Sequence, residues 1–168
     1  PWTNYIGVMP QQDMIYYNHV PDGSGESTMT YYAEDLQGQY QQIFSISFKG
    51  TGYTVTDEDR YQFEGFTYDH GTRNGDNCNG AEFYYKRNVY NLEFYSGSLN
   101  TPDRSNTPKY EENLGSYDYI PTTRPDHVED NAVFVGWYRN PECTGERFDL
   151  SAHVMPANHL ALYAKWVN

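Results

Sequence analysis

The sequence predicts an α+β chain, mostly β, that is built from small modules in tandem. Segments recur along it: residues 9–17 (MPQQDMIYY) are echoed by 155–163 (MPANHLALY), and residues 83–87 (FYYKR) by 162–166 (LYAKW). Residues 43–48 (IFSISF) alternate between two faces, which is the period of a half-buried strand. Recurrence of this kind is typical of repeat arrays, which build length and surface more often than active sites.

Three segments are expected along the chain. Residues 1–20 are interpreted as the C-terminal remnant of a preceding repeat, residues 28–88 as a middle module and residues 89–168 as a last module, because a turn-rich linker (PDGSGES) fills 21–27. The expected strands are 13–18 in the remnant, 29–33, 41–49, 65–68 and 81–86 in the middle module, and 90–95, 132–138 and 160–166 in the last one. Residues 69–80 and 96–108 are expected to be loops.

At most one short helix is expected in each module. The best helix start is at residues 56–59 (TDED), where Thr56 can cap free backbone N–H groups and the acidic residues suit the positive end of the helix dipole. Tyr61 and Phe63 would hold this helix against the sheet, and Gly65 would end it.

Aromatic residues are expected to supply most of the core. The chain has 18 Tyr and 8 Phe but few Leu and Ile, and a Tyr ring can be buried while its hydroxyl reaches water. Residues 63–68 (FEGFTY) match 134–139 (FVGWYR), so Phe66 and Trp137 of the two Gly-aromatic pairs are interpreted as core residues. The closing Trp166 is interpreted in the same way.

Charge and cysteine content limit the partners. The net charge of −12 argues against nucleic acid and against an anionic membrane surface, since both carry negative charge. No apolar run approaches the ~20 residues that span a bilayer. Cys78 and Cys143 lie in corresponding loops of two modules and are expected to stay unpaired, because a disulfide needs Cα atoms within ~7 Å.

Catalytic and metal-binding patterns are not found. The five His residues have no Cys or acid at zinc spacing, and there is no Gly-x-Ser-x-Gly elbow or phosphate-binding loop. The loop 69–77 (DHGTRNGDN) has oxygen ligands for Ca²⁺ but lacks the EF-hand order, so a turn is favoured over a cation site. We therefore expect no enzyme activity, no catalytic or metal-ligating residue and no cofactor.

The last module carries five landmarks in order. They are GWY at 136–138, the Pro- and Cys-containing loop RNPECTG at 139–145, FDL at 148–150, MP at 155–156 and LYAKW at 162–166. Two segments upstream, NLEFYS at 91–96 and PTTRP at 121–125, accompany them. This module resembles the Listeria–Bacteroides repeat, the internalin-B-type B repeat, over residues 89–167. The middle module is similar, more loosely, to mucin-binding-protein-type repeats through its Gly65-Phe66 pair and its final FYYKRN.

The resemblance implies tandem β-grasp (ubiquitin-like) modules in a secreted, cell-wall-associated or otherwise surface-exposed protein of Gram-positive bacteria. The leading hypothesis is a non-catalytic spacer, the stalk of an adhesin, whose partners are neighbouring repeats of the same chain. The alternative is an adhesive module that binds a host glycoprotein or glycan through exposed tyrosines, either Tyr31 with Tyr32 or Tyr117 with Tyr119, or Tyr16 with Tyr17. An accessory module of a secreted enzyme is a remote third reading.

Overall fold

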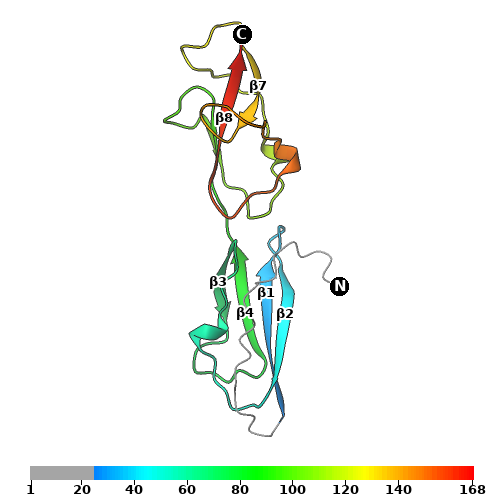
Figure 1. Cartoon of the computed structure of the whole chain (residues 1–168). Helices are drawn as coiled ribbons and strands as arrows, with labels where there is room; N and C mark the ends of the chain where they lie inside the picture. The colour runs from blue at the N-terminus through cyan, green and yellow to red at the C-terminus, as the bar shows by residue number, and fades with distance from the viewer. Residues whose placement is uncertain (1–24) are drawn as a thin grey trace. The chain divides into compact units, whose positions relative to one another are not determined.

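The chain divides into two compact units, Pro1–Asn88 and Val89–Asn168 (Figure 1). The computed structural model describes residues 25–168, so the expected remnant at 1–20 and the Tyr16–Tyr17 pair lie outside the described residues. Each unit carries one four-stranded sheet, and each is described here by itself. Over residues 25–168 the chain is mostly β, with helical structure limited to single 3-10 turns.

The sheet of the first unit has two parallel strands in its centre. β1 (Glu26–Glu34) and β4 (Ala81–Arg87) lie side by side and parallel, and β2 (Tyr40–Lys49) and β3 (Phe66–Gly71) add to them antiparallel, in the order β2-β1-β4-β3 (Figure 1). All four strands expected from the sequence are present. β1 and β3 differ most from the prediction: β1 begins at Glu26, inside the expected linker 21–27, and β3 runs on to Gly71, into the expected loop 69–80.

One face of this sheet is buried under aromatic rings. Tyr31 is fully buried and stacks on Phe44 and Phe83, with ring centroids 4.5 and 5.0 Å away. A bulge in β2 leaves Ile43 without a partner in the register, so that both Ile43 and Phe44 turn toward this core. The expectation of an aromatic core is confirmed in this unit.

The expected helix at residues 56–59 is a single 3-10 turn, η1 (Asp57–Asp59). The Thr56 N–H donates to the Asp59 carboxylate at 2.8 Å, and the buried Asp59 offers its carbonyl oxygen to the Tyr31 hydroxyl at 2.6 Å. Phe63 packs edge-on against Tyr85 at 4.7 Å between centroids. The start signal was therefore correct in position, but the helix ends at Asp59, well before Gly65, which was expected to end it.

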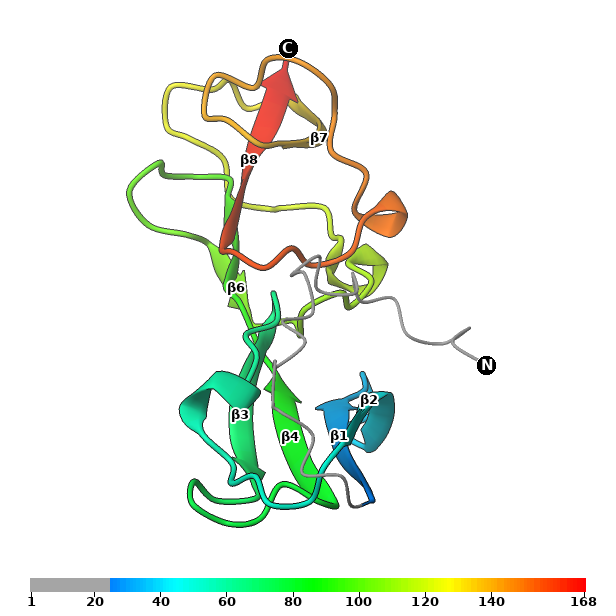
Figure 2. The ribbon, with the colours of Figure 1, turned by 60° about the horizontal axis from the view of Figure 1, so that its bottom comes forward.

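The second unit repeats this strand order with longer loops and with two short strands, β5 and β6 (Figure 2). Its elements are β5 (Leu92–Tyr95), β6 (Arg104–Asn106), β7 (Val133–Tyr138) and β8 (Leu160–Val167), in the order β6-β5-β8-β7 with β5 parallel to β8. β6 corrects the sequence analysis, which assigned 96–108 to a loop. Its residues (RSN) have no apolar alternation, and pairing with β5 alone makes them a strand.

Two further 3-10 turns, η2 (Gly115–Tyr117) and η3 (Leu150–Ala152), exceed the one short helix expected here. η3 is capped by Asp149, whose carboxylate accepts the Ser151 N–H at 3.0 Å. Phe148 and Leu150, on either side of Asp149 in the sequence, are buried in the core. The FDL segment therefore starts a capped 3-10 turn and anchors it in the core through these two side chains.

The core of the second unit joins the sheet to the loops that cover it. Trp137 is 2% exposed, lies 4.8 Å from Phe94 and donates from Nε1 to the Tyr119 carbonyl oxygen at 3.3 Å. The other buried members of this core are Leu92, Phe94, Leu114, Phe148, Leu150, Met155 and Leu162. Trp137 is thus the core residue that the sequence predicted.

The two Gly-aromatic pairs do not occupy equivalent positions in the two sheets. Gly65 precedes β3 with φ +80°, whereas Gly136 lies inside β7 with φ +148°. Tyr68 is the partner of Tyr85 in one sheet and Trp137 the partner of Ala164 in the other. The sequence match of 63–68 with 134–139 is therefore two residues out of register with the strand pairing.

Candidate ligand-binding surfaces

Tyr31 is not a surface residue, and the hypothesis that it contributes an exposed ring is wrong. Its exposed fraction is 0%, both ring faces lie against other aromatic rings, and its hydroxyl donates to a backbone oxygen. The sequence itself indicated that Tyr31 and Tyr32 differ in exposure. Neighbouring residues of a strand point to opposite faces, so only one member of each Tyr-Tyr pair can be exposed.

Tyr32 lies on the open face of the first sheet, where it belongs to a column of stacked rings. Tyr32 stacks on Tyr84 at 4.6 Å with an angle of 8° between ring planes, and Tyr84 stacks on His70 at 4.5 Å and 2°. Tyr40 meets both Tyr84 and His70 edge-on, at 5.2 and 5.6 Å. These four rings come from all four strands, and they are called the tyrosine column below.

Carboxylates contact the polar atoms of the rings in this column. The Asp69 carboxylate accepts from the Tyr40 hydroxyl at 3.1 Å and lies 2.7 Å from His70 Nδ1, and the contact with His70 is the main cause of its lowered pKa. The Tyr84 hydroxyl donates to Glu82 at 2.7 Å, which raises the pKa of Tyr84 to about 12. Because the rings cover one another, Tyr84 has no free face for a sugar and Tyr32 has one at most.

The second unit has a shorter version of this column. Tyr95 of β5 stacks on Tyr163 of β8 at 5.1 Å and 18°, and the Tyr95 hydroxyl donates to Glu93 at 2.8 Å. Both pairs stand across the central parallel strands, at partner positions of the register. Sequence reasoning did not select Tyr84, Tyr95 or Tyr163, although strand alternation places each of them opposite a buried neighbour.

Tyr117 and Tyr119 both pack against the core of the second unit. The Tyr117 hydroxyl donates to Glu112 at 2.8 Å, and burial followed by this bond raises the pKa of Tyr117 to about 12. Tyr119 has the Arg104 guanidinium 3.7 Å from its ring centroid and Phe94 edge-on at 5.1 Å. Neither ring forms the exposed stacking surface expected of them, although a role of either residue in binding stays a prediction.

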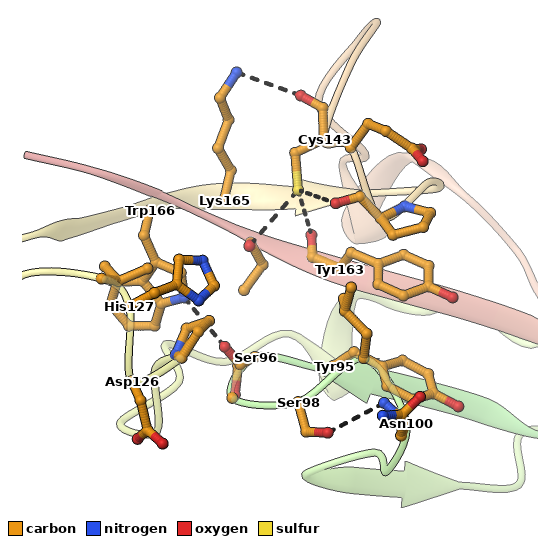
Figure 3. Close-up of a pocket in the computed structure, with 17 residues that line it drawn as sticks. Tyr95, Ser96, Ser98, Asn100, Asp126, His127, Cys143, Tyr163, Lys165 and Trp166 are labelled. Atoms are coloured by element: carbon orange, nitrogen blue, oxygen red, sulfur yellow. Dashed lines mark hydrogen bonds between the residues drawn. The ribbon is translucent and has the colours of Figure 1, made fainter.

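A cleft of about 650 Å³ opens in the second unit where β5 ends and β8 continues beyond it (Figure 3). Its walls come from three loops, around residues 96–100, 125–128 and 141–143, and its floor includes Tyr163 and Trp166. The Trp166 Nε1–H donates to the Ser96 carbonyl oxygen at 3.3 Å, which ties β8 to the first of these loops.

Cys143 forms one corner of the cleft in an unusual backbone conformation, with φ +50°. Its thiol points at the backbone of β8, 3.6 Å from the Ala164 carbonyl oxygen, and Lys165 Nζ donates to the Cys143 carbonyl oxygen at 3.3 Å (Figure 3). Burial raises the pKa of the Cys143 thiol. The thiol is thus a packed structural group, and Cys78 and Cys143 are both free cysteines.

Residues 90–165 match the family model of the Listeria-Bacteroides repeat domain. The second unit is a Listeria–Bacteroides repeat domain. The match spans nearly all of Val89–Asn168 and confirms the resemblance drawn from the sequence landmarks. Domains of this type are non-catalytic modules found in bacterial surface proteins.

No curated protein matches the chain significantly. The mucin-binding-type resemblance of the first unit stays a prediction. Within the part of the chain that the structure describes, no helix is long and apolar enough to cross a membrane.

The geometry of the Listeria–Bacteroides repeat explains its landmarks. Trp137 of the GWY, Phe148 and Leu150 of the FDL, and Met155 of the MP are all buried in one core. The closing LYAKW is β8, which contributes the buried Leu162. Most of the landmarks therefore record how the loops fold over the sheet, while Pro141–Cys143, Tyr163 and Trp166 also line the cleft.

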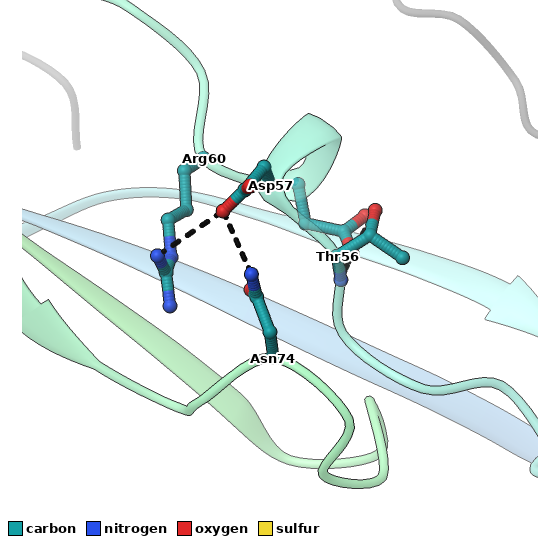
Figure 4. Close-up of polar contacts among 5 residues, drawn as sticks. Thr56, Asp57, Arg60 and Asn74 are labelled. Carbon is teal, nitrogen blue, oxygen red and sulfur yellow. Dashed lines mark hydrogen bonds and ion pairs between the residues drawn. The ribbon is translucent and has the colours of Figure 1, made fainter.

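The loop 69–77, the calcium candidate of the sequence analysis, uses its polar side chains to contact other protein groups. Asn74 of the loop donates to the Asp57 carboxylate at 2.7 Å, and Arg60 lies 3.4 Å from the same oxygen (Figure 4). Arg73 pairs with Asp76 at 3.5 Å. No cluster of three His, Cys, Asp or Glu side chains that could hold a metal ion occurs among residues 25–168. These contacts favour a turn that ties the loop to η1.

Proposed function

We propose that this chain is a non-catalytic spacer segment of a Gram-positive cell-surface protein, part of the stalk that carries an adhesive domain. The observation that carries the proposal is repetition of architecture. Two units in one chain have the same strand order around a parallel central pair, and the second is a repeat domain of a surface-protein family. Repeated small domains add length without needing any site of their own.

Both units are variants of the β-grasp fold in this proposal. A mixed sheet with parallel central strands and antiparallel outer strands supports the assignment in each case. The long crossing connection, a helix in ubiquitin-like proteins, is here a loop with 3-10 turns. The first unit is then a diverged copy, for which a mucin-binding-type origin remains our proposal.

The spacer proposal is tested by binding. The chain is applied to an array of mucins, matrix proteins and glycans, and the result expected of a spacer is no saturable binding to any of them. Saturable binding that a single surface substitution abolishes would contradict the spacer role. The substitution must avoid Tyr31, because replacing a fully buried ring would test folding instead of binding.

The second candidate, an adhesive module for a host glycan, is favoured by the cleft of the Listeria–Bacteroides repeat. Its floor holds the half-buried Tyr163 and Trp166, and polar side chains such as Ser98 and Asn100 line its wall. Aromatic floors with a few polar groups are typical of small-ligand sites. For this candidate, glycan binding must be lost in Trp166→Ala and be retained in Tyr32→Ala of the other unit.

A further inference from the structure

Among the described residues, the first and the last strand of each unit form its central parallel pair. β1 is the first described strand of the first unit and β4 its last, and β5 and β8 have the same places in the second unit. A pull on the two ends of a unit therefore acts on neighbouring strands in opposite directions along their common axis. The strands must slide past each other, so the hydrogen bonds between them resist together.

The pulled strand pair of the first unit carries aromatic contacts on both faces of the sheet. In the first unit the pair is in register from Met29↔Ala81 to Ala33↔Tyr85. Tyr31 stacks on Phe83 on the buried face and Tyr32 on Tyr84 on the open face, at 5.0 and 4.6 Å. Rings thus join β1 to β4 on both sides of the sheet.

The outer strands reinforce this junction in the first unit more than in the second. His70 of β3 and Tyr40 of β2 extend the tyrosine column, and Asp69 contacts both of them. In the second unit the register of β5 with β8 is shorter, from Leu92↔Leu160 to Tyr95↔Tyr163, and it carries the Tyr95–Tyr163 stack alone.

We infer that both units are mechanical clamps, in which the parallel strand pair and its stacked tyrosines resist extension of the chain. The inference deepens the proposed spacer function, on which it rests: a stalk under tension transmits force through every unit from its first strand to its last. The first unit is the stronger clamp, because its pair is longer and its rings connect all four strands.

The test is single-molecule force spectroscopy on the full chain, held by handles at its two ends. Unfolding of the first unit should release roughly 200 Å of chain and that of the second roughly 250 Å, given at most about 3.6 Å per residue. The two events are therefore distinguishable in one molecule. At constant force, the first unit is expected to outlive the second.

Moving one handle changes the direction of force on the first unit alone. With the handle attached at the exposed Gln37, between β1 and β2, β1 and β4 are pulled apart from the same end and their bonds break one after another. The lifetime of the first unit is expected to fall by roughly tenfold or more, while the second unit serves as an unchanged internal reference. Equal lifetimes of the first unit in the two geometries would overturn the clamp.

Substitutions then test whether the tyrosine column provides the mechanical resistance of the first unit. Tyr84→Ala should shorten the lifetime of the first unit under end-to-end force by about fivefold or more, since one lost aromatic pair is worth about fivefold and Tyr84 contacts three rings. Tyr84→Phe keeps the stack and should retain it. Ser45→Ala is the matched control, because Ser45 pairs with Thr30 across β1 and β2 on the same face, away from the sheared pair. An equal loss in Ser45→Ala would refute a specific role of the column.

Failure of the clamp and failure of the spacer are separable. Low resistance in both pulling geometries, with no binding on the array, would refute the clamp and leave an unloaded spacer. High resistance in a chain that binds a glycan would refute the spacer role and retain the clamp.

Discussion

The two units have the same strand order but differ in strand length and in the packing of their cores. In the first, β1 and β2 are long, and the core is formed by stacked rings such as Tyr31, Phe83 and Tyr85. In the second, β5 and β6 are short, and loops with two 3-10 turns cover a core centred on Trp137. The comparison shows why only the second carries recognisable family landmarks. Its landmarks describe loop packing, whereas the topology that the units share needs only alternating strands.

The largest expected effect comes from removing the central ring of either core. Tyr31→Ala and Trp137→Ala should each lower the free energy of unfolding of their own unit by about 3–5 kcal/mol. Hydrogen exchange of the full chain, resolved by peptide, reports the units separately. Tyr31→Phe is the control and should cost about 1 kcal/mol, for the bond to the Asp59 carbonyl oxygen. Loss of protection in both units from one substitution would contradict their independence.

The two units are expected to differ in how well they tolerate a side chain in place of a glycine of an outer strand. A Cβ on Gly71 would lie 2.2 Å from the Glu82 carbonyl oxygen, whereas one on Gly136 would lie 2.6 Å from Nε of the exposed Arg147, a side chain that can move. Gly71→Ala should therefore cost the first unit about 3 kcal/mol or more and Gly136→Ala the second about 1–2 kcal/mol. Urea unfolding of each variant measures this. The reverse order would mean that the backbone of β7 is the more constrained.

Acid should weaken both units through their turn carboxylates. Backbone hydrogen bonds, first of all from Gln39, lower the pKa of Asp35, and the hydrogen bond from the Ser151 side chain lowers that of Asp149. A lowered pKa gives stability that is present above the ordinary value of 3.8 and is lost as pH falls through the folded value. Asp35→Asn should reduce the acid sensitivity of the first unit only, and Asp149→Asn that of the second. Unchanged acid profiles would exclude these carboxylates as the cause.

The smallest effect concerns the tyrosines of the open faces. The hydrogen bond to Glu82 raises the pKa of Tyr84 from 10.0 to about 12, so this stabilisation is present below 10 and is lost as pH rises toward 12. Glu82→Gln should lower the pKa of Tyr84, and Glu93→Gln should lower that of Tyr95 in the other unit. Phenolate absorbance during alkaline titration measures both shifts. A Tyr84→Phe variant identifies the signal, and an unaltered titration in Glu82→Gln would show that the hydrogen bond is absent.

Strand positions were predictable from the sequence because alternation and turn residues determine them locally. The strand β6 was missed, since a short polar strand has no pattern of its own and depends on its partner β5. The match of Gly65 to Gly136 was two residues out of register, since a local motif does not record how an outer strand pairs with its neighbour.

Candidate surfaces were less predictable than the strands. Alternation states that Tyr31 and Tyr32 face opposite sides, but only the packing of η1 and Phe44 decides which side is covered. The cleft beside Trp166 needs three loops distant in sequence to come together, which no local pattern records.

The central claim is that both units are built on a parallel pair of terminal strands, and NMR of the full chain tests it most directly. Interstrand proton contacts should follow a parallel pattern between Met29–Ala33 and Ala81–Tyr85, and again between Leu92–Tyr95 and Leu160–Tyr163. Amides of these four segments should also exchange slowest within their units. An antiparallel pattern, or no contacts between β5 and β8, would contradict the shared architecture and with it the clamp.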